Sequence, residues 1–294
     1  MVKVIKIVIL SILVIFLVGI LVFQDKINFS FVTKYDYLVL DTEISAQDIE
    51  NIDIESTRLE IFKSETDEFR IIERASKEIN EDKKIVIETN NNTLKIKNPM
   101  NRIGFNILNM GTVQTKIELY IPEKIYNKVS LKTLSGGISL EELNCNNFDA
   151  KLTSGDVEIK DLQAKDATFD LTSGSIKIDN IVANELMLLA TSGQMKVKGK
   201  VENILDINIT SGTVDVETSV LTKEIESTQT SGKIKISIPE NDGFKLKYNL
   251  TSGDIDSDFE LDNDIGKKGT ARYKDGEKNI VVNMTSGTFS LKKK

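Results

Sequence analysis

A Thr-Ser-Gly triplet returns through the second half of the chain at a nearly fixed spacing. The triplets begin at Thr153, Thr172, Thr191, Thr210, Thr230, Thr251 and Thr285, and a Leu-Ser-Gly variant begins at Leu134. Successive serine positions differ by 19 as far as Ser211, and then by 20, 21 and 34. A fixed period of this length is typical of a chain that winds into stacked, similar coils. The repeat therefore predicts an all-β fold, a single-stranded β-helix or β-solenoid with coils of about 19 residues.

Alternating apolar and polar residues fill the space between triplets. Val157 and Ile159 follow one triplet, and Ala167, Phe169 and Leu171 precede the next. A period of two predicts strands with one buried face. Each of these positions is apolar again one repeat earlier and one repeat later. We therefore expect every coil to carry two strands and two turns, with the second turn near residues 162–164.

The triplet itself is interpreted as a corner of the coil. The residue before it is expected to point inward, threonine outward and serine inward, so that stacked serines hydrogen-bond along the corner. Glycine supplies the backbone conformation that a tight turn requires. The predicted corner residues are Ser135, Gly136, Ser154, Gly155, Ser173, Gly174, Ser192, Gly193, Ser211, Gly212, Ser231, Gly232, Ser252, Gly253, Ser286 and Gly287.

Composition excludes several classes of function. A nucleophilic serine needs a base, and the chain has no histidine; seven equivalent triplets also argue against one catalytic centre. With 38 basic and 45 acidic residues, the net charge of −7 gives no footprint for nucleic acid. The single Cys145 aligns with Ala164 and Ala183, so we expect a small buried side chain. We expect no catalytic residue, no metal site and no cofactor.

An acidic run covers residues 254–264, where every second residue is Asp or Glu. On a strand these carboxylates share one face, which is interpreted as a solvated face that also protects a sheet edge. A calcium site is the alternative, because Ca²⁺ prefers oxygen ligands. The run lacks the spacing of known calcium loops.

The first residues have a different composition from the rest. Residues 7–23 are apolar except for Ser11 and Gly19, and Lys3 and Lys6 precede them. A helix needs about 20 apolar residues to span a bilayer, and basic residues favour the cytoplasmic side. We therefore expect a cytoplasmic segment 1–6, a transmembrane signal anchor 7–23 and a stalk 24–37, with the remainder outside the cytoplasm. A cleaved secretory signal is the alternative.

Residues 38–130 are rich in predicted strands but lack the Ser-Gly period, which becomes regular over 131–294. They are interpreted as degenerate coils that cap the membrane-proximal end, with a separate sandwich domain as the alternative. The segment 101–115 is expected to be a loop over the open end of the core, or an exposed patch that contacts a partner. Its possible contact residues are Ile103, Phe105, Ile107, Leu108 and Met110. The long step before Thr285 predicts a polar hairpin or loop around residues 266–272.

The Ser-Gly repeats and alternating strands resemble the bacterial putative-adhesin family of β-solenoids, a domain of unknown function. With the N-terminal apolar segment, the chain looks like the LiaG-like membrane-anchored members. The resemblance implies a link to cell-envelope stress responses and surface display, and no catalytic residues. We therefore expect a single-pass, non-catalytic binding or scaffold module of the cell envelope, with envelope or membrane proteins as partners. A surface adhesin and a carbohydrate-active enzyme are the alternatives.

Overall fold

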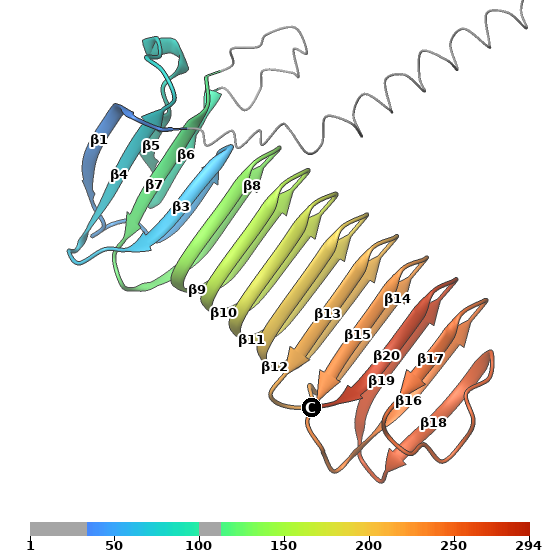
Figure 1. Cartoon of the computed structure of the whole chain (residues 1–294). Helices are drawn as coiled ribbons and strands as arrows, with labels where there is room; N and C mark the ends of the chain where they lie inside the picture. The colour runs from blue at the N-terminus through green and yellow to red at the C-terminus, as the bar shows by residue number, and fades with distance from the viewer. Residues whose placement is uncertain (1–33, 100–112) are drawn as a thin grey trace, which may run out of the picture. The chain divides into compact units, whose positions relative to one another are not determined.

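A computed structural model of the chain describes residues 34–99 and 113–294, and residues 35–294 form one compact unit (Figure 1). Within the described residues the fold is all-β, with one short 3-10 helix, η1 (Glu81–Lys83). No helix in this part of the chain is long and apolar enough to cross a membrane. The predicted anchor 7–23 and the apolar residues Ile103–Met110 lie outside the described residues.

The strands pair into one continuous sheet. They are β1 (Tyr37–Ser45), β2 (Asn51–Glu55), β3 (Arg58–Lys63), β4 (Glu68–Ala75), β5 (Val86–Asn90), β6 (Thr93–Lys97), β7 (Thr115–Ile121), β8 (Ile125–Thr133), β9 (Gly137–Leu152), β10 (Asp156–Leu171), β11 (Ser175–Ala190), β12 (Gln194–Ile209), β13 (Thr213–Thr218), β14 (Glu224–Gln229), β15 (Lys233–Ile238), β16 (Gly243–Leu250), β17 (Asp254–Ser257), β18 (Lys268–Lys274), β19 (Lys278–Met284) and β20 (Thr288–Lys293).

The sheet folds into two layers whose inner faces form one hydrophobic core. In the repeat region, layer 1 holds the segments that follow a Ser-Gly turn, and layer 2, apart from β18, holds the segments that precede one. The order in layer 1 is β1-β4-β7-β3-β9-β10-β11-β12-β13-β15-β20-β17. The order in layer 2 is β5-β6-β2-β8-β9-β10-β11-β12-β14-β19-β16-β18. Strands β9 to β12 run through both layers.

The predicted period of the repeat is confirmed as the pairing register. Val157 pairs with Ile138 on one side and with Ile176 on the other, and all three are buried. Ala164 likewise pairs with Cys145 and with Ala183. The register holds because each apolar column fills the same depth of the core in successive coils.

The second turn of each regular coil is a bend within a strand, which the sequence interpretation missed. Strands β9, β10, β11 and β12 each continue for 16 residues from one Ser-Gly turn to the next. The chain bends at Leu162 and Ala164, yet both residues stay paired with the neighbouring coils. Pairing therefore continues around the bend, with small register shifts on either side of it between β11 and β12.

The stacking order at the C-terminal end differs from the order along the chain. β14 and β15 pair with β19 and β20, whereas β16 and β17 lie one step further out. The last strands of the chain are thus inserted between two earlier ones (Figure 1). The N-terminal end is also out of chain order. There β2 lies between β6 and β8, and β3 lies between β7 and β9. Stacking in chain order, which a regular repeat implies, is therefore broken at both ends.

The long step before Thr285 contains a strand where the sequence predicted a polar hairpin or loop. β18 runs antiparallel to β16 and forms the edge of layer 2. The acidic run is strand only as far as Ser257, where β17 ends, but its acidic residues are all exposed and Phe259 between two of them is buried, as an alternating face requires. Phe259 packs against Phe244 and Tyr273, with ring centroids 5.3 and 4.9 Å away. This aromatic cluster closes the C-terminal end of the core.

An exposed carboxylate fastens the same end. Glu240, between β15 and β16, accepts hydrogen bonds from Lys274 Nζ at 2.7 Å and from the Tyr273 hydroxyl. It also forms an ion pair with Lys293 Nζ at 3.0 Å. These donors, Lys274 first, lower the pKa of Glu240 from its ordinary 4.5 to about 2. Glu240 therefore ties three segments of the C-terminal end together while it is ionised.

We predict that this fastening disappears between pH 4.5 and about 2. A carboxyl pKa lowered by folding adds stability above its unfolded value, and that stability is lost as pH falls through the folded value. Glu240→Gln should lower the Tm above pH 4.5 and match the wild type near pH 2. The carbon-13 shift of the Glu240 carboxyl should titrate near pH 2. A midpoint at the ordinary value would contradict the prediction.

Candidate functional site

The Ser-Gly turns lie one above another along one side of the stacked coils. Their backbone groups pair from coil to coil: Ser154 N donates to Leu134 O at 3.0 Å, and Ser175 N to Gly155 O at 3.0 Å. Ser192 N donates in the same way to Thr172 O at 2.9 Å. The turns are thus held by main-chain bonds at the usual strand spacing of about 4.8 Å.

The glycines have the role that the sequence indicated, and close packing adds a second reason for them. Gly174 has a φ of +108°, in the region that favours glycine. A Cβ placed on Gly174 would lie 1.9 Å from the carbonyl oxygen of Gly155. The residues just before the triplets, such as Leu152 and Leu171, are fully buried, as expected.

The serines do not point inward. Threonine and serine of every triplet are both exposed, because the turn interrupts the alternation of the strands. We call this column the Thr-Ser ridge; it consists of Thr153, Ser154, Thr172, Ser173, Thr191, Ser192, Thr210, Ser211, Thr230, Ser231, Thr251, Ser252, Thr285 and Ser286. From the repeat alone, these residues were expected only to form the turns. Two adjacent hydroxyl residues at the end of a strand were the feature of the sequence that could have indicated an exposed pair.

The ridge presents donors and acceptors at a regular spacing. Each hydroxyl can donate one hydrogen bond and accept others. The turn backbone is already satisfied by the main chain, so the side chains are not needed for that purpose. A rigid row of hydroxyls repeated about every 4.8 Å is suited to binding a partner along its length. The ridge has no histidine to act as the base for a serine, because the chain contains none.

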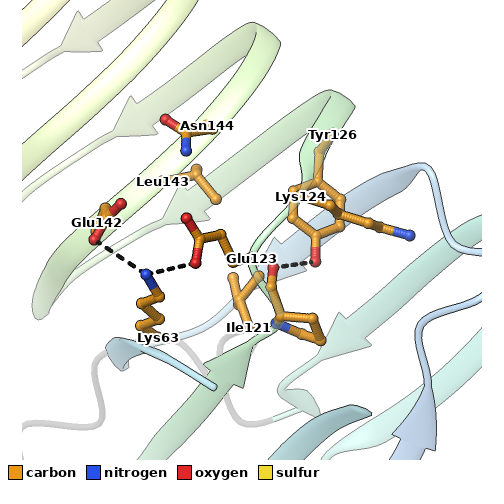
Figure 2. Close-up of a pocket in the computed structure, with 9 residues that line it drawn as sticks. Lys63, Ile121, Glu123, Lys124, Tyr126, Glu142, Leu143 and Asn144 are labelled. Carbon is orange, nitrogen blue, oxygen red and sulfur yellow. Dashed lines mark hydrogen bonds and ion pairs between the residues drawn. The ribbon is translucent and has the colours of Figure 1, made fainter. Parts of the chain in front are cut away.

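A small pocket where the N-terminal strands meet the regular coils is structural. Lys63 lies between Glu123, at 2.7 Å, and Glu142, at 3.9 Å (Figure 2). The Tyr126 hydroxyl donates to Pro122 O at 3.0 Å, and burial raises the pKa of Tyr126. The cavity volume is about 20 Å³, which is room for about one water molecule. These contacts join the strand ends and leave no space for a substrate.

The remaining candidate groups are tied up within the protein. Cys145 is buried, and burial raises the pKa of its thiol to about 12, so it is not a reactive nucleophile. In the acidic run, Asp256 and Asp258 accept hydrogen bonds from Lys292 at 2.7 and 2.9 Å. Within residues 34–99 and 113–294, no three His, Cys, Asp or Glu side chains are grouped to hold a metal ion.

Known proteins place the chain by family. The model of the Toastrack DUF4097 family matches residues 49–292. Among curated proteins, none matches the chain.

Several solved structures are similar at low identity. A putative adhesin from Parabacteroides distasonis shares 11% identity over 88% of this chain and 99% of its own, with a TM-score of 0.48. A putative lipid binding protein from the same species shares 14% over 87% and 96%, with a TM-score of 0.41. A putative cell adhesion protein from Clostridium sporogenes shares 16% over 87% and 100%, with a TM-score of 0.25. Because these identities and TM-scores are low, the solved structures indicate nothing about function. The family model, in contrast, matches most of the chain. The chain belongs to the Toastrack DUF4097 family.

Proposed function

We propose that the chain is a non-catalytic binding module of the bacterial cell envelope, tethered to the membrane by residues 7–23 with the solenoid outside the cytoplasm. The Thr-Ser ridge is its binding surface, and its partners are envelope or membrane proteins. The tether rests on the apolar run after Lys3 and Lys6. A role in envelope-stress sensing, as a LiaG-like member, is part of the proposal.

The observation that carries the proposal is the exposed ridge on a rigid stack of coils. Strands β9 to β12 pair with one another from one Ser-Gly turn to the next. The backbone that carries the hydroxyls is therefore held in a fixed position. A surface that is already ordered costs little conformational entropy when it binds. A surface adhesin is the second candidate function, because the same ridge could contact molecules outside the cell.

The proposal predicts that large side chains on the ridge abolish partner capture. Ser173→Arg, Ser192→Arg and Ser211→Arg place three arginines on consecutive coils, at exposed positions that the core does not need. We expect a loss of at least about tenfold in the partner crosslinked to the full chain in intact cells, because displaced hydroxyls lose their hydrogen bonds. The Tm should stay unchanged.

The matched control places three arginines at the second bend, in Gln163→Arg, Val182→Arg and Asn203→Arg, which are also exposed. It should leave crosslinking intact. Equal loss in both variants, or in neither, would refute the ridge as the binding surface. The tether is tested separately: protease added to protoplasts should cut the solenoid, and recovery of the intact chain in the cytosol would refute that part. Crosslinks to molecules outside the cell alone would favour the adhesin.

A further inference from the structure

The outer side of layer 2 carries two patches of unpaired charge with opposite signs. Five carboxylates point outward from β10, β11, β12 and β14, and we call them the acidic patch: Asp166, Glu185, Asp206, Glu224 and Glu226. Four cations follow on β16 and β18, and we call them the basic patch: Lys245, Lys247, Lys268 and Arg272. In the part of the chain that the structure describes, no member of either patch forms an ion pair.

Elsewhere on the sheet, opposite charges pair from coil to coil. Lys177 lies 2.7 Å from Glu158 on the next coil and 3.2 Å from Asp179. Lys235 pairs with Asp215 at 3.4 Å, and other coils repeat the arrangement. Layer 2 has such pairs at β8 to β10, where Lys128 lies 2.7 Å from Asp149 and Lys151 lies 2.6 Å from Asp170. The charges of the two patches, further along layer 2, are left without this neutralisation.

One strand separates the two patches. Strand β19 lies between β14 and β16 and carries Asn279, Val281 and Asn283 on its outer side. The backbones of β14 and β16 are therefore two strand spacings, about 9.6 Å, apart. Within the basic patch, Lys245 directly faces Arg272 across the strands, and like charges in such a pair are destabilising.

We propose that layer 2 pairs with layer 2 of a second copy of this chain, the two stacks of coils running in opposite directions. A two-fold axis through the β14–β19 boundary would lay β16 of each copy on β12 of the other, and β18 on β11. Each basic patch then meets an acidic patch, and the same contact occurs twice, as an isologous dimer requires. A second copy of the chain therefore neutralises the acidic patch and the basic patch together.

The surface relief fits this pairing. The acidic side chains line a groove of about 330 Å³ whose apolar members include Ala167, Leu186 and Met187. Met187 is 38% exposed, which is high for a methionine in a core strand. Long lysine and arginine side chains of the second copy can enter the groove, bury their aliphatic parts on Met187 and reach the carboxylates.

The test measures the association of the full chain in a non-ionic detergent by sedimentation. At low salt we expect a dimer that dissociates at about 0.5 M salt, where the Debye length falls to a few ångströms. Lys247→Glu with Arg272→Glu should weaken association at least about tenfold, and so should Glu185→Lys with Glu226→Lys. The variant carrying all four changes should associate again, because its patches are exchanged but still complementary.

The matched control is Lys196→Glu with Lys233→Glu, two exposed lysines on layer 1, and it should dimerise like the wild type. A chain that is monomeric at low salt, or a dimer that both reversals leave unchanged, would overturn the proposal. The proposal would also be overturned if the variant with all four substitutions stayed monomeric. Polyphosphate binding to a monomeric chain, lost in Lys247→Glu with Arg272→Glu, would assign the basic patch to a polyanion instead and also overturn it.

Discussion

Gly174→Ala is expected to lower the free energy of unfolding by about 3–5 kcal/mol, which places it in the rare tail of single substitutions. The new Cβ would lie 1.9 Å from Gly155 O and 2.8 Å from Gly155 N. Gly155 is held in place by the coil before it, because Ser154 N donates to Leu134 O at 3.0 Å and Asp156 N to Gly136 O at 2.9 Å. Alanine also resists a φ of +108°. Relief requires two coils to separate, at the cost of bonds such as Ser175 N to Gly155 O, 3.0 Å long.

The matched control is Gly266→Ala in the loop before β18, where a Cβ would meet no atom within 4 Å. It should change the free energy of unfolding by no more than about 0.5 kcal/mol. Both variants are compared by urea unfolding of the full chain, followed by circular dichroism. If Gly174→Ala were as mild as the control, close packing of successive turns would not be the reason for glycine.

The coils could be read from the sequence because each apolar position repeats in the next coil. Phe169, for example, pairs with Ala150 and Leu188, as the period of the repeat required. The direction of the serines could not be read in the same way. A strict alternation would bury Ser173, but the turn changes the backbone direction there, and Ser173 is exposed.

The order of the last coils was equally hidden in the sequence. Every coil offers the same apolar columns and main-chain bonds, so any coil pattern fits on any other. One residue carried a signal: Gln229 is polar at an inward position where Leu152 and Leu171 are apolar. Its amide donates to Gly232 O at 2.8 Å and to Ser286 O at 3.3 Å. The buried amide thus joins the β14–β15 turn to the β19–β20 turn that lies against it.

The candidate surfaces needed the structure because they depend on which side chains face outward together. Lys245 and Arg272 are far apart in the sequence, and only the antiparallel pairing of β16 with β18 sets them side by side. Their separation from Glu224 and Glu226 follows from the insertion of β19, which the sequence did not predict. The basic patch and its separation from the acidic patch therefore depend on pairings that the sequence did not predict, whereas the acidic patch lies on coils stacked in chain order.

Removal of residues 276–294 is expected to unfold β16, β17 and β18 together with the deleted strands. β16 pairs with β18 and β19, and β17 pairs with β20, so the deletion removes the link between these strands and the core. What remains is the antiparallel pair of β16 and β18, and an isolated two-stranded unit is only marginally stable in water. Hydrogen exchange should show amide protection of β16 and β18 falling at least about a hundredfold, with β9 to β12 unaffected.

The matched control keeps the deleted strands but cuts the chain. A protease site inserted after Asp275, an exposed residue between β18 and β19, gives a nicked protein that retains residues 276–294 and should retain full protection. A synthetic peptide of residues 276–294, added to the truncated chain, should restore protection of β16 by strand addition. Sequential stacking makes the opposite prediction: β16 and β17 would dock directly on β14 and β15 and stay protected after truncation. Protection retained without the peptide would therefore show that the inserted coil is not what holds the C-terminal end in place.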